Sequence, residues 1–142
     1  MPLVRDLLAV KKPGFISISP DATVFETVEQ MSSHKIGAIL VMQGKALLGV
    51  FTERDLMNRV IVASKDPKTT KVSEVMTTRV AVGKIEMPLK EAAMLMSSNR
   101  IRHLPIVENG EVVNMISTGD VMARQLNDEK QTIEHLEHYF FS

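Results

Sequence analysis

The sequence predicts an α+β fold made of two copies of one structural unit. Three observations predict it: an internal repeat, short apolar strands that alternate with helical patterns, and a chain of 142 residues. When the chain is shifted by 65 residues, residues 20–59 align with 85–124 without a gap, and eight of the 40 pairs are identical. A repeat of about 60 residues would be marginal alone, so we expect the two copies to pack together.

Composition excludes several functional classes. The chain has 17 basic and 17 acidic residues, so net charge gives no general case for binding nucleic acid or an anionic membrane. It has no cysteine, which excludes disulfides, thiol catalysis and Cys-ligated metals. No apolar run approaches the roughly 18 residues of a membrane span, and the N-terminus does not resemble a signal peptide. A cytoplasmic protein is the expectation.

The first repeat begins with a helix and a short strand. Leu3, Leu7 and Val10 form an apolar helical stripe, which we expect to pack on the other repeat rather than lie on a membrane. Residues 15–19 alternate as a strand that stops at Pro20. The next helix is capped by Asp21 or Thr23, and its apolar face consists of Val24, Val28 and Met31.

The rest of the first repeat reads as a hairpin and a helix. Residues 36–42 form an apolar strand, residues 43–45 a turn, and residues 47–51 the partner strand. Thr52 then opens a helix that is predicted to run to about Ala63.

The second repeat follows the same order. Residues 64–71 are polar and form the predicted linker. The elements expected after it are a helical turn at 73–76, strands at 80–82, 104–107 and 112–116, a helix at 89–98 with Pro88 in its first turn, an Asn109-Gly110 turn, and a helix from Ser117 toward Phe140.

The last strand of each repeat is followed by a hydroxyl residue, with an acid three positions later. Thr52 precedes Asp55 in the first repeat, and Ser117 precedes Asp120 in the second. One interpretation is structural, because this spacing forms a capping box at a helix N-terminus. The other is functional, because a carboxylate can accept hydrogen bonds from both hydroxyls of a ribose. The residues alone favour the structural interpretation.

The duplicated motifs resemble a tandem pair of CBS domains, also called a Bateman module. The resemblance rests on Val72-Ser73-Glu74-Val75-Met76-Thr77, on Arg102-His103-Leu104-Pro105-Ile106-Val107 and on the two hydroxyl-x-x-Asp endings. The resemblance covers nearly the whole chain. The chain is most similar in length and motifs to stand-alone bacterial-type proteins with a CBS pair. The resemblance implies β-α-β-β-α repeats with pseudo-twofold symmetry at residues 8–65 and 72–128, a helical tail at 129–142, and homodimers.

The resemblance also implies clefts between the repeats that bind adenine nucleotides. AMP, ADP or ATP is the main expectation, with NAD(H) or S-adenosylmethionine as further ligands of the family. Asp55 and Asp120 would then bind ribose, with support from Thr52 and Ser117. The resemblance therefore favours a binding role for the two acids, whereas the residues alone favour the purely structural interpretation.

A cation pair in the second repeat distinguishes the two clefts. By resemblance, Thr52 and Asp55 would share a cleft with Arg102 and His103, whose side chains can donate to phosphate. Surface charge is the alternative for Arg102. Ser117 and Asp120 would share the other cleft with Gly37 and Ala38, which carry no charge, so the first cleft should prefer phosphates.

Apolar residues at the strand starts are candidates for the base slots. They are Ile16, Val80 and Ala81, and plain core positions are the equal alternative. Asn114 departs from the family pattern, in which glycine is common, as at Gly49. Because asparagine tolerates a left-handed backbone, the fold should survive there.

No catalytic or metal site is predicted. His135 and His138 lie on one predicted helical turn but match no zinc motif, so a solvated helix face is the better interpretation. No phosphate-binding loop or nucleophile elbow occurs. The sequence therefore predicts a non-catalytic nucleotide sensor that relays energy or redox state to a partner protein. The alternatives are a homodimerisation or adaptor module with vestigial clefts and, less favoured, a weak hydrolase or redox enzyme.

Overall fold

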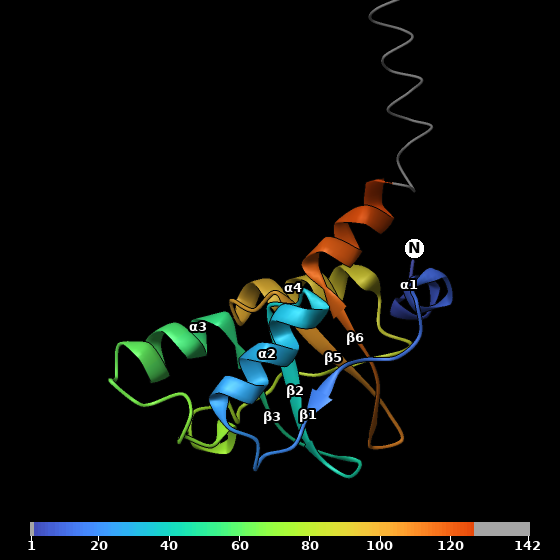
Figure 1. Ribbon diagram of the computed structural model, residues 1–142. Coiled ribbons are helices and arrows are strands. Elements are labelled where there is room, and N and C mark those ends of the chain that lie inside the picture. Colours follow the sequence, from blue (N-terminus) through green and yellow to red (C-terminus); the bar gives the residue numbers. More distant parts are fainter. Residues whose placement is uncertain (1, 127–142) are drawn as a thin grey trace, which may run out of the picture. The chain divides into compact units, whose positions relative to one another are not determined.

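The computed structural model describes residues 2–126, and within them the chain forms two compact units (Figure 1). One unit holds residues 14–81 and 108–113, and therefore most of the first repeat. The other holds the N-terminal segment up to Pro13, residues 82–107, and the described residues from Asn114 onward. Each repeat contains a three-stranded sheet with helices, so the predicted α+β class is confirmed.

The sheet of the first repeat has the strand order β1-β2-β3. Strand β1 (Ser17–Ile18) runs parallel to β2 (Ala38–Gln43), which is antiparallel to β3 (Ala46–Thr52). Helix α2 (Val24–His34) is capped by Thr23, whose side chain accepts from the Glu26 N–H while the Glu26 carboxylate accepts in return. Of the two predicted caps, Thr23 is therefore the one used.

The helix after β3 differs from the regular helix predicted from Thr52 to Ala63. Helix α3 (Glu53–Asp55) passes directly into a π-helix at Leu56–Ile61. In a π-helix each backbone hydrogen bond spans five residues instead of four, a difference that the apolar periodicity of this segment cannot reveal. Val60 is buried within it, so the apolar face of the prediction is retained.

The second sheet has the strand order β4-β5-β6. Its strands are β4 (Gly83–Lys84), β5 (His103–Glu108) and β6 (Glu111–Ser117), and helix α4 spans Leu89–Ser98 as predicted. The prediction of a strand at 80–82 was wrong: these residues form no strand, and β4 begins at Gly83, directly after the predicted segment. A Cβ atom at Gly83 would lie 2.9 Å from the terminal methyl carbons of Leu104 and Ile106, so glycine fits closely against these side chains, and it gives this strand position no apolar signal.

The segment that precedes each repeat packs in the unit of the other repeat. We call residues 3–12 and 71–77 the two lead-in segments. Helix α1 (Val4–Val10) belongs to the first lead-in, and the Val4 N–H donates to Met87 O at 2.8 Å, beside the start of α4. The predicted packing of this helix on the other repeat is confirmed.

The second lead-in packs in turn on the first repeat. It contains a short 3-10 helix at Val72–Glu74, and Val72 and Val75 belong to a core cluster with Ile39 and Phe51. The final described helix spans residues 118–126. The helical tail predicted for residues 129–142, with its apolar stripe and with His135 and His138, lies outside the described residues.

Candidate functional site

The Thr52–Asp55 motif forms a complete capping box at the start of α3. The Asp55 N–H donates to the Thr52 hydroxyl at 3.1 Å, and the Thr52 N–H donates to the Asp55 carboxylate at 3.0 Å. These two reciprocal bonds satisfy backbone groups that a helix N-terminus leaves without intrahelical partners. The structural interpretation of this motif is therefore correct, whatever further role it has.

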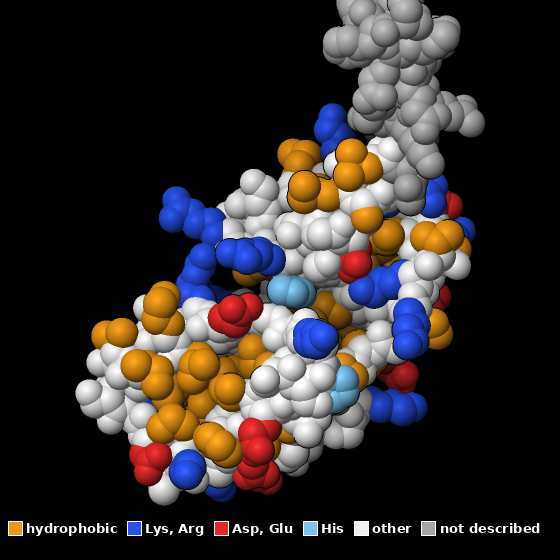
Figure 2. Space-filling view, turned by 45° about the horizontal axis from the view of Figure 1, so that its top comes forward, with side chains coloured by type: hydrophobic (Ala, Val, Ile, Leu, Met, Phe, Trp, Pro, Cys, Tyr) orange, Lys and Arg blue, Asp and Glu red, His pale blue; other side chains and the backbone are white. Residues whose placement is uncertain are grey.

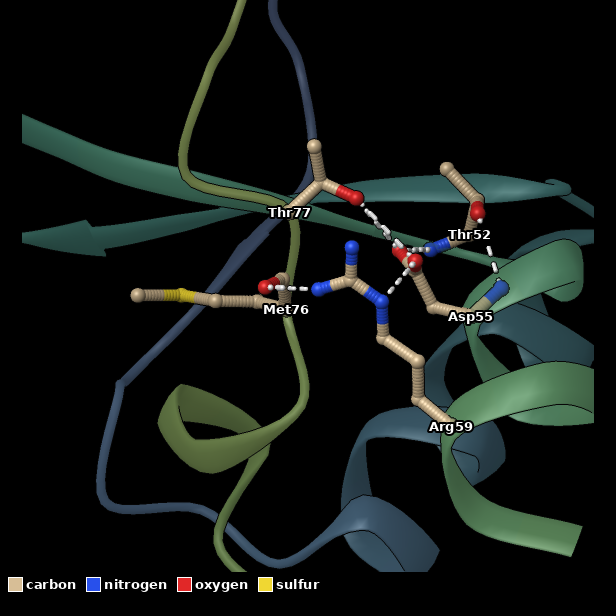
Figure 3. Close-up of polar contacts among 5 residues, drawn as sticks. All are labelled: Thr52, Asp55, Arg59, Met76 and Thr77. Carbon is tan, nitrogen blue, oxygen red and sulfur yellow. Dashed lines mark hydrogen bonds and ion pairs between the residues drawn. The ribbon is translucent and has the colours of Figure 1, made fainter. Parts of the chain in front are cut away.

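Two more side chains contact the carboxylate of Asp55 (Figure 3). The Thr77 hydroxyl, from the second lead-in, donates to Asp55 Oδ1 at 3.0 Å. Arg59 Nε lies 3.6 Å from the same oxygen, while Arg59 Nη1 donates to Met76 O at 2.9 Å. Asp55 is only 6% exposed. Its carboxylate is thus held by the protein's own donors, and a ribose would have to displace Thr77 or Arg59 to reach it.

The Ser117–Asp120 motif has the same capping geometry but a different third partner. Ser117 N–H donates to Asp120 Oδ2 at 2.8 Å, and Asp120 N–H donates to the Ser117 hydroxyl at 3.0 Å. Lys11, at the C-terminal end of α1, places its ammonium 2.7 Å from Asp120 Oδ2. The side chain of Asp120 is 30% exposed, so solvent and small molecules can reach it.

The pKa of Asp120 reflects this environment. Burial acts to raise the pKa, but the hydrogen bond from Lys11, the Ser117 backbone bond and the charge of Lys11 together lower it below its ordinary value. Asp120 is therefore ionised at neutral pH and presents a carboxylate that can accept further hydrogen bonds.

The residues predicted to approach phosphate or base start the central strand of each sheet. Arg102 is exposed and its carbonyl accepts from the Thr118 N–H at 2.9 Å, which places the residue beside the Ser117–Asp120 motif. His103 is the half-buried first residue of β5. In the first repeat, Gly37 occupies the position of Arg102, and its carbonyl accepts from the Glu53 N–H at 3.1 Å.

The side chain of Glu53 makes the start of β2 different in charge from the start of β5. It covers Gly37 so closely that a Cβ atom there would overlap the carboxylate. An acid thus lies beside the strand start of the first repeat, where the second repeat carries Arg102. Ala38 follows Gly37 and is fully buried at the start of β2.

The candidates for base slots lie in one unit. Ile16, Val80 and Ala81 are half-buried, and Ile16 also packs against the core cluster of the first repeat. The two predicted pairings, Asp55 with Arg102 and Asp120 with Gly37, combine residues of both units and stay predictions.

The backbone at Gly49 and Asn114 differs from the left-handed conformation considered for these equivalent positions. Neither residue has a left-handed backbone. Gly49 is required because the second lead-in lies against it: a Cβ atom would be 2.6 Å from Thr77 O and 2.7 Å from Met76 Sδ. Asn114 is buried, and its side-chain oxygen accepts from the Met115 N–H at 2.7 Å. The difference is therefore one of packing rather than of backbone conformation.

Sequence reasoning missed the partners that the lead-in segments supply. Lys11 and Thr77 belong to different lead-ins, and each contacts the acid of the motif in its unit. The 65-residue shift carries information about them, because it aligns Lys11 with Met76 and Lys12 with Thr77. Helical and strand patterns carry none, since Lys11 directly follows α1 and Thr77 lies outside the helices and strands.

Comparison with known proteins agrees with this duplicated architecture. The model of the CBS domain family matches residues 4–62 and 72–127. The chain belongs to the CBS-domain family. The tandem CBS pair is 36% identical over 113 residues to the CBS domain-containing protein YhcV of Bacillus subtilis, covering 80% of each chain. It is 33% identical over 124 residues to the mitochondrial protein CBSX3 of Arabidopsis thaliana, covering 84% of this chain and 60% of that relative.

Solved structures give the same result for the fold. The crystal structure of the CBS domain NE2398 has a TM-score of 0.84 and 34% identity, covering 88% of this chain and 98% of the other. The CBS-domain containing protein ATU1752 from Agrobacterium tumefaciens has a TM-score of 0.82 and 33% identity, covering 87% and 99%. This family consists of non-catalytic regulatory modules, and the CBS pair is accordingly not an enzyme.

The described residues give no support for a metal centre or a membrane span. Within residues 2–126, no group of three His, Asp or Glu side chains could hold a metal ion. No helix in the same described range is long and apolar enough to cross a bilayer.

Proposed function

We propose that this CBS pair is a regulatory module that binds an adenine nucleotide through the Ser117–Asp120 motif. The observation that carries the proposal is the state of Asp120, a carboxylate that is ionised, half-buried and reachable from solvent. A carboxylate in this state can accept hydrogen bonds from both hydroxyls of a ribose without first losing its capping bond to Ser117.

The same unit contains cationic side chains that suit a phosphate. Arg102 and His103 lie at the start of β5, and the bond from Thr118 N–H to Arg102 O joins this strand start to the helix that carries Asp120. An arginine fork and a histidine can donate charge-assisted hydrogen bonds to phosphate oxygens. A diol acceptor and phosphate donors within one unit match the two polar parts of a nucleotide.

A structural relative supports the ligand class. CBSX2 has been crystallised in complex with AMP, and it shares this fold with a TM-score of 0.76 at 22% identity. The fold is therefore able to hold AMP in another protein. ADP, ATP, NAD(H) and S-adenosylmethionine remain the further ligands to test.

The other predicted site residues enter the proposal with lesser weight. We propose Thr52 and Asp55 as a second ribose site that opens only when Thr77 gives way, and Ile16, Gly37, Ala38, Val80 and Ala81 as neighbours of a base. The module would relay energy or redox state to a partner protein. A cytoplasmic location stays a prediction.

Thermal melting and titration calorimetry of the full chain test this function. A ligand that binds only the native state raises its melting temperature. We expect a rise with at least one of AMP, ADP, ATP, NAD+ and S-adenosylmethionine, and none with GMP. Asp120→Asn should weaken that binding by about tenfold to a hundredfold, the scale of hydrogen bonds to a charged group.

A matched control is Glu91→Gln, which alters an exposed acid in the first turn of α4. It should leave nucleotide affinity unchanged. The proposal fails if no adenine nucleotide binds, or if Asp120→Asn and Glu91→Gln have the same effect.

A second candidate function, homodimerisation as an adaptor, is favoured by one observation. The helices that follow the two motifs expose apolar side chains at matching positions: Met57 and Ile61 in the first repeat, and Met122 and Leu126 in the second, are each at least 56% exposed. Exposed hydrophobic side chains also lie among the charged ones in Figure 2. Such side chains are candidates for a contact between subunits.

Sedimentation velocity of the wild type and of the double variant Met57→Lys/Met122→Lys tests this candidate. An adaptor should dimerise without nucleotide and become monomeric in the variant. A nucleotide sensor with no adaptor role should respond to ligand in the calorimetric test and keep its oligomeric state in both chains.

A further inference from the structure

Lys11 occupies a position that the capping function of Asp120 does not require. In the first repeat, the equivalent acid receives the Thr77 hydroxyl and lies 3.6 Å from the guanidinium of Arg59, and the residue aligned with Lys11 is Met76. The fold therefore forms this motif without an ammonium group. Lys11 therefore brings a positive charge from the lead-in segment, whereas the cation beside Asp55 comes from Arg59 on the helix of the same motif.

The backbone that carries Lys11 is well anchored. The Lys11 N–H donates to Leu7 O at the end of α1, and α1 is tied to the loop before α4 by the bond from Arg5 N–H to Ile85 O at 2.8 Å and by the ion pair of Arg5 with Glu86. The Lys11 side chain is 24% exposed, so most of its stem is covered while solvent still reaches the pair. An ammonium held in this way loses less conformational entropy on binding a ligand than a free surface lysine.

The chemistry of the pair suits an anionic ligand. An ammonium group has three donors, and only one of them is used by Asp120 Oδ2. A carboxylate alone would repel the phosphate of a nucleotide whose ribose it binds. Lys11 neutralises that repulsion and offers further donors to a phosphate oxygen.

We propose that Lys11 is a ligand-binding residue of the Asp120 site and that it selects nucleoside phosphates over nucleosides. This inference rests on the proposed nucleotide-binding function and adds to it a specificity-determining residue from the N-terminal lead-in. It assigns to that lead-in a direct role in ligand selection, beyond its packing on the second repeat.

Calorimetry with AMP and adenosine on the full chain tests the proposal. The variant is Lys11→Met, which keeps an unbranched apolar stem, removes the charge and introduces the residue that the aligned position carries. AMP affinity should fall by about five- to twentyfold, and adenosine affinity should change by less than about threefold. Lys12→Met removes the neighbouring exposed lysine and should leave both affinities unchanged.

A double-mutant cycle assigns the effect to this site. In an Asp120→Asn background, Lys11→Met should have little further effect on AMP binding, because the two residues act on one ligand. Wild type that binds neither AMP nor adenosine would overturn both the proposed function and this inference. Wild type that binds AMP, with an unchanged AMP-to-adenosine ratio in a folded Lys11→Met, would overturn this inference alone. Independent, additive effects of the two substitutions would overturn it as well.

Discussion

The two hydroxyl-x-x-Asp motifs of this CBS pair are alike in sequence and backbone but differ in what surrounds the acid. Asp55 is almost completely buried and receives the Thr77 hydroxyl and the Arg59 side chain. Asp120 is partly exposed and receives one ammonium group, from Lys11. The first acid is therefore part of the protein's internal structure, whereas the second is available to an additional partner.

The difference originates in the lead-in segments rather than in the repeats themselves. The acid of each motif receives a further side chain from the segment that precedes the other repeat in the chain. The capping box is therefore the same in both repeats, while the lead-in residue that contacts its acid differs. Thr77 and Lys11 supply chemically different groups to equivalent acids. The chemistry of each motif is thus determined by residues outside the repeat that contains it.

Removing each acid should produce the largest contrast. Asp55→Ala removes a buried acid and leaves the half-buried Thr52 N–H and Thr77 hydroxyl without their acceptor, so we expect a loss of about 2–4 kcal/mol in the free energy of unfolding. Asp120→Ala should cost about 0.5–1.5 kcal/mol, because solvent can replace the acid there. Urea denaturation followed by circular dichroism measures both values.

Asp21→Ala is a suitable control for this experiment, because its side chain is 79% exposed and pairs only loosely with Lys71 at 3.7 Å. It should change stability by less than about 0.5 kcal/mol. Equal losses for Asp55→Ala and Asp120→Ala would show that the two environments are energetically the same, and the comparison would then be wrong.

The close approach of the second lead-in to β3 predicts the next largest effect. Gly49→Ala would place a Cβ atom 2.6 Å from Thr77 O, so either β3 or the lead-in must shift. We expect a loss of about 1–3 kcal/mol. Gly119→Ala is the matched substitution beside the other motif, where the nearest atom is the Ser117 hydroxyl oxygen at 3.6 Å.

Because Gly119 lies in a helix, alanine there should be neutral or stabilising by about 0.5–1 kcal/mol. Chemical denaturation of the two variants in parallel gives the comparison. A Gly49→Ala variant as stable as the wild type would mean that the lead-in does not pack tightly against β3.

Much of this fold could be predicted from periodicity and from the repeat. Helix α4 was predicted at its observed bounds, and the hairpin turns at Gly44 and Asn109-Gly110 have the left-handed backbone that glycine and asparagine favour. The π-helix after Asp55 and the strand that begins at Gly83 were not predicted. The first depends on backbone hydrogen bonding, and the second begins at a glycine, which carries no apolar side chain for a strand pattern to detect.

The site was predicted in part for a related physical reason. A capping box is local, so Thr52, Asp55, Ser117 and Asp120 could be recognised from spacing alone. The partners that the lead-in segments supply to the two acids are 22 and 109 residues away in the chain. Contacts across such distances leave no local pattern, and the exposure that separates Asp120 from Asp55 cannot be derived from two motifs of the same spacing.

The smallest effect that we expect is a pH dependence specific to Asp120. Its pKa in the folded protein lies below the ordinary value of 3.8, because Lys11 and Ser117 outweigh the effect of burial. A carboxyl group whose pKa is lowered by folding stabilises the native state above its unfolded pKa, and that contribution is lost as the pH falls through the folded value. Asp120 should therefore contribute fully at neutral pH, begin to lose this contribution as the pH falls below about 4, and lose it entirely below its folded pKa.

Lys11→Met should remove most of this contribution, since the lysine provides both a hydrogen bond and a charge. The difference in unfolding free energy between wild type and Lys11→Met should be at most about 1 kcal/mol at pH 7, because the pair is partly screened by solvent. It should shrink as the pH falls from 5 to 2.5, when Asp120 becomes protonated and can no longer pair with the ammonium.

Urea titrations of both chains at pH 7, 5, 3 and 2.5 measure this difference in unfolding free energy, with Lys12→Met as the control that should follow the wild type at every pH. A gap that stays constant or widens in acid would mean that Lys11 stabilises the fold through its apolar stem. The Lys11–Asp120 pair would then be a packing contact, and the electrostatic contrast with Asp55 would lose its basis.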